Sequence, residues 1–66
     1  MIANPNELRV SLEQMGRVIN ALDDVKQTVL PKNPALFATL AEAYLEDLNR
    51  LRLEIDDYLL ELKTAS

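Results

Sequence analysis

Two carboxylates in the second half of the chain, Glu54 and Asp57, have the spacing that most directly suggests chemistry. In a helix, residues three positions apart share one face, where their oxygens can bind the same Mg²⁺ ion. The sequence offers no matching second pair, because Glu42 and Glu46 are four positions apart. We therefore expect no catalytic residue, no bound metal and no cofactor. A small metal-dependent nucleotide hydrolase or binder, assembled across a dimer from Glu54, Asp57 and their symmetry mates, remains as the alternative.

The composition removes most other enzyme chemistry. The 66 residues contain no Cys, no His and one Gly. These absences exclude a disulfide framework, zinc and haem sites, thiol catalysis and histidine-based acid–base catalysis. A single glycine also leaves no phosphate-binding glycine loop. The composition thus favours a protein that is not an enzyme.

The charge is acidic, with 11 Asp and Glu against 7 Lys and Arg, and a net charge of −4. Nucleic acid is a polyanion, so direct binding to it is disfavoured. The acids concentrate in the second half, where they would attract a basic protein. We predict an acidic partner-binding face made of Glu46, Asp47, Glu54, Asp56, Asp57 and Glu61.

The sequence shows neither a signal peptide nor a membrane span. Its first residues lack a basic start and a long apolar core, and no apolar run approaches the ~18 residues that a transmembrane helix needs. We expect a cytoplasmic protein that does not contact a membrane.

Proline divides the chain into two segments. Pro31 and Pro34 bracket residues 31–34, and each proline disfavours helix in the residue before it. The sequence predicts one helix over about 5–30, a turn over 31–34 and a second helix over about 34–63.

Apolar residues in both segments recur with helical periods. In the first segment they are Leu8, Leu12, Met15, Val18, Ile19, Leu22, Val25 and Val29. In the second segment a strict alternation of four and three, typical of a heptad seam, connects Phe37, Ala41, Tyr44, Leu48, Leu51, Ile55, Tyr58 and Leu62. Four more residues widen that seam, namely Leu36, Leu40, Leu45 and Leu59. A stripe of this width favours more than one neighbouring helix.

Two asparagines have the sequence context of helix N-caps. Asn4 precedes Pro5 and has Glu7 three positions later, although Ser11 is a competing start. Asn33 precedes Pro34 in the same way. Gly16 lies within the first helix, where it costs about 1 kcal/mol relative to Ala. Either simple tolerance or the close approach of another helix explains it.

These signals predict an all-α fold in which residues 1–66 form a single domain. The short turn permits only an antiparallel two-helix hairpin. A chain this short buries a small fraction of its surface, so we expect a homodimer that forms a four-helix bundle. The predicted self-association seam consists of Met15, Leu22, Phe37, Tyr44, Leu48, Leu51, Ile55, Tyr58 and Leu62.

Two stretches also carry a family resemblance. The opening Met-Ile-x-Asn, the Arg9-Val10-Ser11 that follows it, and the segments 45–48 and 54–58 resemble the N-terminal region of short bacterial antitoxin-like regulators. In that family a helical hairpin precedes a DNA-binding domain of the Cro/repressor type, and the usual partner is a RelE-like toxin that cleaves mRNA. The chain stops at Ser66, where that domain would begin, so operator binding is not implied.

The resemblance implies a protein-interaction role for the hairpin. A ribonuclease that binds RNA has a basic surface, which an acidic helix can approach and mask. We therefore expect a small interaction module that self-associates and offers its acidic face to a basic protein such as a RelE-like toxin.

Overall fold

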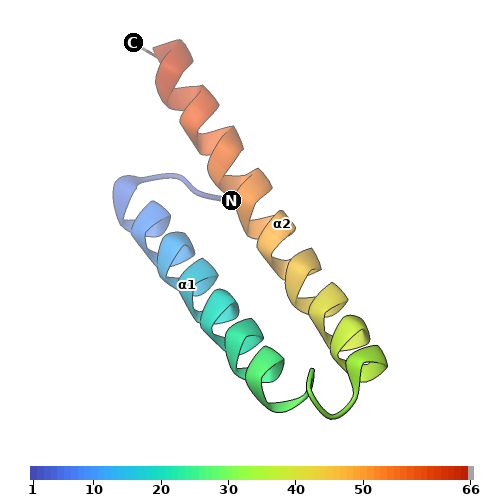
Figure 1. Ribbon diagram of the computed structural model, residues 1–66. Coiled ribbons are helices and arrows are strands. Elements are labelled where there is room, and N and C mark those ends of the chain that lie inside the picture. Colours follow the sequence, from blue (N-terminus) through green and yellow to red (C-terminus); the bar gives the residue numbers. More distant parts are fainter. Residues whose placement is uncertain (66) are drawn as a thin grey trace.

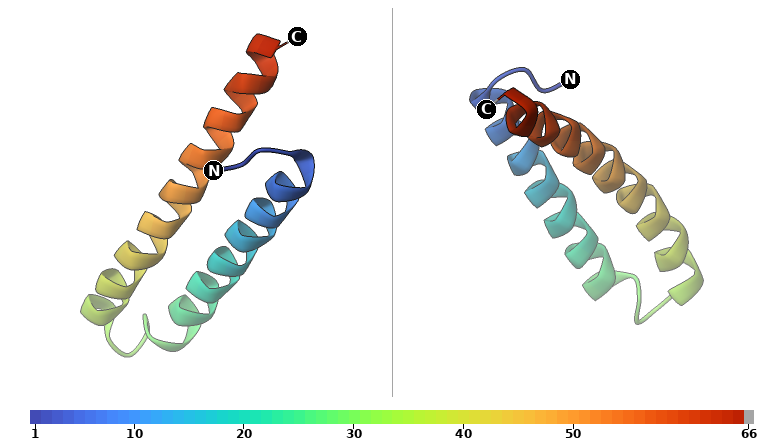
Figure 2. Two further views of the ribbon diagram at one scale, coloured as in Figure 1. Left: turned by 180° about the vertical axis from the view of Figure 1, so that it is seen from behind. Right: turned by 90° about the horizontal axis from the view of Figure 1, so that it is seen from above.

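The computed structural model describes residues 1–65, which form two long helices joined by a short connection (Figure 1). Helix α1 spans Pro5–Thr28 and helix α2 spans Pro34–Ala65. The helices run antiparallel and lie side by side, as all views agree (Figures 1 and 2). The predicted all-α helical hairpin is confirmed.

Asparagine caps begin both helices. The Oδ1 atom of Asn4 accepts the Glu7 N–H at 2.9 Å, which settles the start of α1 in favour of Asn4 over Ser11. The Glu7 carboxylate in turn accepts the Ala3 N–H at 3.3 Å. At α2, the Leu36 N–H donates to Oδ1 of Asn33 at 3.0 Å. These bonds satisfy backbone donors that a helix start leaves without intrahelical partners.

The connection is closed by one carbonyl. The oxygen of Val29 accepts the N–H groups of Lys32 at 3.0 Å and Asn33 at 2.7 Å. The helix ends near 30 and 63 that the sequence predicts differ slightly from the observed ends at Thr28 and Ala65. Helix ends depend on fraying and capping, so sequence patterns predict them less well than they predict the helices themselves.

The best-buried residues lie toward the open end of the hairpin, away from the connection. Leu51, Ile55 and Tyr58 of α2 are buried, with exposed fractions of 3%, 9% and 6%. The N-terminal segment 1–4 leaves α1 and crosses to α2 (Figure 1), and Ile2 is 5% exposed in the same cluster as Ile55 and Tyr58. This segment therefore contributes to the core although it is not helical.

Contacts from α1 complete this cluster. Leu8 and Met15 are half-buried and pack against it. Ser11, which lies between them, is 9% exposed. Leu12 and Ile19, which the sequence predicts as part of the same apolar stripe, are each 52% exposed. Fewer residues of α1 face the core than its apolar periodicity predicts.

Candidate interaction surfaces

The two long sides of the hairpin follow from the 100° step of the α-helix. When two helices pack antiparallel, residues that directly precede an inward-facing residue lie on the same side of the hairpin in both helices. Residues that directly follow an inward-facing residue lie on the opposite side. A groove confirms this geometry, because Gln14 and Arg50, which precede Met15 and Leu51, line it together.

The side that precedes the core residues is acidic along α2. We call it the acidic side, and four of the six acids predicted to bind a partner share it, each directly before a seam residue: Asp47, Glu54, Asp57 and Glu61. The other two do not. Glu46 lies farther round the outer surface of α2, and Asp56 follows Ile55 on the opposite side, where it pairs with Arg52 at 3.7 Å. The predicted acidic face is therefore divided.

Arg50 interrupts the acidic side. Its guanidinium lies 3.8 Å from the Asp47 carboxylate and 4.0 Å from that of Glu54. Arg50 thus pairs with Asp47, one of the acids predicted to bind a partner. Both pairs are solvent-exposed, so each contributes little to stability. The most acidic part of the side is the stretch beyond Arg50, toward Glu61.

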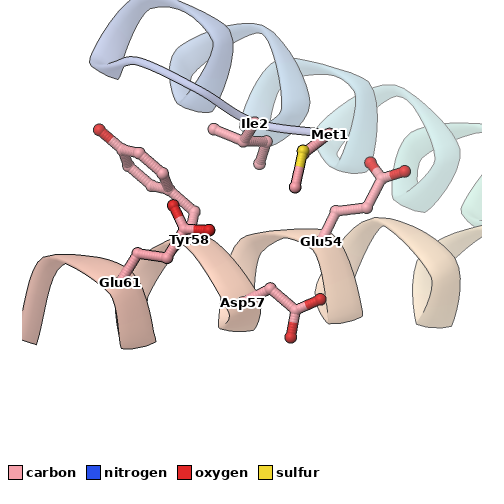
Figure 3. Close-up of a pocket in the computed structure, with 6 residues that line it drawn as sticks. All are labelled: Met1, Ile2, Glu54, Asp57, Tyr58 and Glu61. Carbon is pink, nitrogen blue, oxygen red and sulfur yellow. The ribbon is translucent and has the colours of Figure 1, made fainter. Parts of the chain in front are cut away.

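A shallow groove lies between this acidic stretch and the N-terminal segment (Figure 3). Met1, Ile2 and Tyr58 line it together with Glu54, Asp57 and Glu61. Figure 3 shows the Glu54 side chain directed toward Met1, whereas the Asp57 carboxylate points away from the segment. Within residues 1–65, no group of three or more acidic side chains is placed to hold a metal ion.

The opposite side of the hairpin carries a row of exposed aliphatic residues, beside which lies the ion pair of Arg52 and Asp56. We call it the apolar side, and it is formed by four residues that each directly follow an inward-facing residue: Leu12, Ile19, Leu45 and Leu59. Their exposed fractions are 52%, 52%, 53% and 42%. By the same geometry Gly16 follows Met15 and Arg52 follows Leu51, which places both on this side. Aliphatic side chains from both helices are therefore half-exposed along one surface.

Further apolar residues are exposed elsewhere on α2. Leu53 and Leu60 lie seven positions apart on its outer surface and are 55% and 60% exposed. Leu62 has the phase of the seam but is 48% exposed, because α2 continues past the start of α1 (Figure 1). These residues provide controls for substitutions on the apolar side.

The structure gives most of the predicted self-association seam a different role. Leu51, Ile55 and Tyr58 are buried within a single chain, so they are not available on its surface for a second copy. Five more members have the same inward phase and are half-buried: Met15, Leu22, Phe37, Tyr44 and Leu48. The physical reason is proximity, because the short connection holds the other helix of the same chain against each seam.

Ile2 is a buried residue that the apolar periodicity of the sequence does not predict. Its signal is an apolar residue two positions before the Asn4 cap, one position earlier than in a hydrophobic staple, where the residue directly before the cap packs against one in the first turn. Leu8 is that first-turn residue, and it packs against the cluster containing Ile2. An isolated apolar residue in a non-helical segment has no periodicity that would identify it.

Comparison with protein-family models, with curated proteins and with solved structures finds no match to this chain. The resemblance to antitoxin-like regulators therefore stays a prediction. In the part of the chain that the structure describes, neither helix is long and apolar enough to cross a membrane.

Proposed function

We propose that this hairpin is a protein-interaction module, which self-associates through its apolar side and offers its acidic side to a basic protein. The observation that carries the proposal is the row of half-exposed aliphatic residues on one side: Leu12, Ile19, Leu45 and Leu59. Two hairpins that stack these sides form a four-helix bundle. Stacking would remove the apolar residues from water and leave the acidic side outward.

The size and shape of the hairpin support self-association. Its radius of gyration is 15.0 Å and its dimensions are 51 × 16 × 14 Å. A compact domain of this length has a radius of gyration of about 11 Å. The accessible surface is 4995 Å², against about 4,250 Å² for a typical monomer of this mass. The excess is of the order of the ~800 Å² that each partner buries in a standard interface.

The acidic side supports the choice of a basic partner. Along α2, the positions of the acidic side that follow Arg50 are Glu54, Asp57 and Glu61. Negative potential along one surface raises the rate of encounter with a positive one. A RelE-like ribonuclease has the required chemistry, since a surface that binds RNA is basic. Such a partner would meet the acidic side while the apolar sides of two copies remain in contact.

Self-association is tested by light scattering and circular dichroism over a dilution series. We expect a dimer that loses helicity as it dissociates. Ile19→Lys should shift the dissociation to at least tenfold higher protein concentration, because it places a charge on the apolar side. The matched control is Leu53→Lys, a change of similar size on the outer surface, which should leave the mass unchanged. A monomer at every concentration would overturn this part of the proposal.

Partner binding is tested with a purified RelE-like ribonuclease by titration calorimetry. The double variant Asp57→Asn, Glu61→Gln should bind at least tenfold more weakly than the parent chain, and added salt should weaken the parent more than the variant. The control, Glu13→Gln with Glu46→Gln, removes two charges that lie outside both the acidic side and the apolar side. Equal affinities for all three chains, or no binding by the parent, would refute the assignment of this surface and this partner.

A further inference from the structure

We infer that the occupant of the apolar side is a second copy of this chain running in the opposite direction, with the two-fold axis passing across the hairpin at Gly16 and Arg52. This inference rests on the proposed self-association and goes further, because it assigns the arrangement of the two copies. In this arrangement α1 lies over α1 and α2 lies over α2, with the two connections at opposite ends of the bundle.

The spacing of the apolar residues indicates this symmetry. Leu45 and Leu59 lie seven positions before and after Arg52, and Leu12 and Ile19 lie four before and three after Gly16. Gly16 and Arg52 are at a similar height, because Gln14 and Arg17, two positions before and one after Gly16, line one groove with Arg50 and Leu51. The four aliphatic residues are thus arranged nearly symmetrically about one line across the hairpin.

A two-fold axis along that line makes the apolar side self-complementary. It brings Leu45 of one copy onto Leu59 of the other, and Leu12 onto Ile19. A two-fold interface requires this property, since the same surface must serve both partners. If the copies instead ran in the same direction, α1 would lie over α2 of the other copy, and Ile19 would meet Leu45.

The presence of glycine at position 16 supports this position of the two-fold axis. A Cβ added to Gly16 would meet no atom of residues 1–65 within 4 Å outside its own helix backbone and chain neighbours, so nothing within the described chain requires glycine there. On the axis, Gly16 of one copy faces Gly16 of the other, and two helices that cross at glycines can approach closely. The glycine on the apolar side is thereby explained by a contact between copies.

Charge also favours opposite directions. Residues 52–65 at the open end carry four acids against two bases, whereas the charges of Asp23, Asp24, Lys26 and Lys32 near the connection balance. Copies in the same direction would bring two acidic ends together, and copies in opposite directions separate them. Arg52 near the axis pairs with Asp56 of its own chain at 3.7 Å, which reduces the repulsion between the two arginines.

Disulfide cross-linking tests the arrangement, because the chain has no Cys and a disulfide needs Cα atoms within about 7 Å. Single-cysteine variants Leu45→Cys and Leu59→Cys are mixed, allowed to exchange subunits and oxidised, and the heterodimer is identified by mass. We expect it to form at least fivefold faster than in a mixture of Leu53→Cys with Leu59→Cys, where one cysteine lies on the outer surface. Arg52→Cys alone should form a linked homodimer at a comparable rate, because Arg52 lies on the proposed axis.

The outcomes separate the inference from the proposed function. If Ile19→Cys mixed with Leu45→Cys cross-links fastest, the copies run in the same direction, and the inference fails while self-association stands. If the chain is a dimer but no mixture exceeds the Leu53→Cys control, another surface forms the contact, and the inference fails again. If light scattering on the untreated parent shows only a monomer, the proposed self-association fails with it.

Discussion

Ile2 and Tyr58 lie in one buried cluster, although one precedes the first helix and the other is near the end of the second. The N-terminal segment therefore acts as a third packing element of a two-helix protein. It also forms one wall of the groove beside the acidic side (Figure 3).

Ile2→Ala should destabilise the protein by about 2 kcal/mol, the cost of removing a buried aliphatic side chain and leaving a cavity. Urea unfolding followed by circular dichroism at a fixed protein concentration measures this change. Leu60→Ala is the control, since that side chain is 60% exposed and its loss should cost no more than about 0.5 kcal/mol. Equal effects of the two substitutions would show that the N-terminal segment is not held by Ile2.

Leu51→Asp should abolish most of the helicity at every protein concentration, because Leu51 is 3% exposed within one chain and a buried carboxylate lacks a partner there. Far-ultraviolet circular dichroism measures the loss. Leu53→Asp, two positions away on the outer surface, should retain the parent spectrum. A Leu51→Asp chain that stays helical but becomes monomeric would place Leu51 between copies instead of within the hairpin.

Gly16→Ala should have opposite effects on the isolated chain and on the dimer. At dilutions where the chain is monomeric, the added methyl group removes the glycine penalty and should stabilise α1 by about 1 kcal/mol. At higher concentrations the same methyl group obstructs the crossing, and the dissociation constant should rise. Asn20→Ala serves as the control, because it improves helix propensity off the apolar side. An unchanged or tighter dimer in Gly16→Ala would contradict a close crossing at Gly16.

Asn33→Ala should lower the free energy of unfolding by about 1 kcal/mol, because the Leu36 N–H loses its side-chain acceptor. Asn33→Asp should retain most of the stability, since a carboxylate oxygen can accept the same bond. Thermal and urea unfolding of the two variants provide the comparison. Asn20→Ala, at an exposed position within α1, controls for the loss of an asparagine side chain. An equal cost of Asn20→Ala and Asn33→Ala would show that the lost stability does not come from the cap.

The helices and their starts are predictable because they depend on local signals. Asn4 and Asn33 each precede a proline and supply an oxygen three residues before a free N–H, so the caps can be found without tertiary information. The heptad phase of α2 likewise identifies Leu51, Ile55 and Tyr58 as inward-facing. What the phase does not reveal is whether the facing helix belongs to the same chain or to another.

The inward face of α1 is less predictable. Ser11 is buried while its neighbour Leu12 is half-exposed, which reverses the order expected from hydrophobicity. The contacts that Ile2 and α2 make with α1 determine whether Ser11 or Leu12 is buried. The sequence of α1 alone does not indicate these contacts. The predicted acidic face is divided for a related reason, since it groups residues by charge, whereas the helix step separates Asp56 from Glu54.

The distance between the buried cluster and the connection has a consequence for hydrogen exchange. Residues near the connection, such as Phe37 and Leu40, are only half-buried, although closing the chain there costs little entropy. Leu51, Ile55 and Tyr58 require a longer segment to be closed before they contribute stability. Amides around 51–58 should therefore exchange slowest. Local opening should begin beside the connection, where the two helices are closest along the chain but their facing residues are less buried.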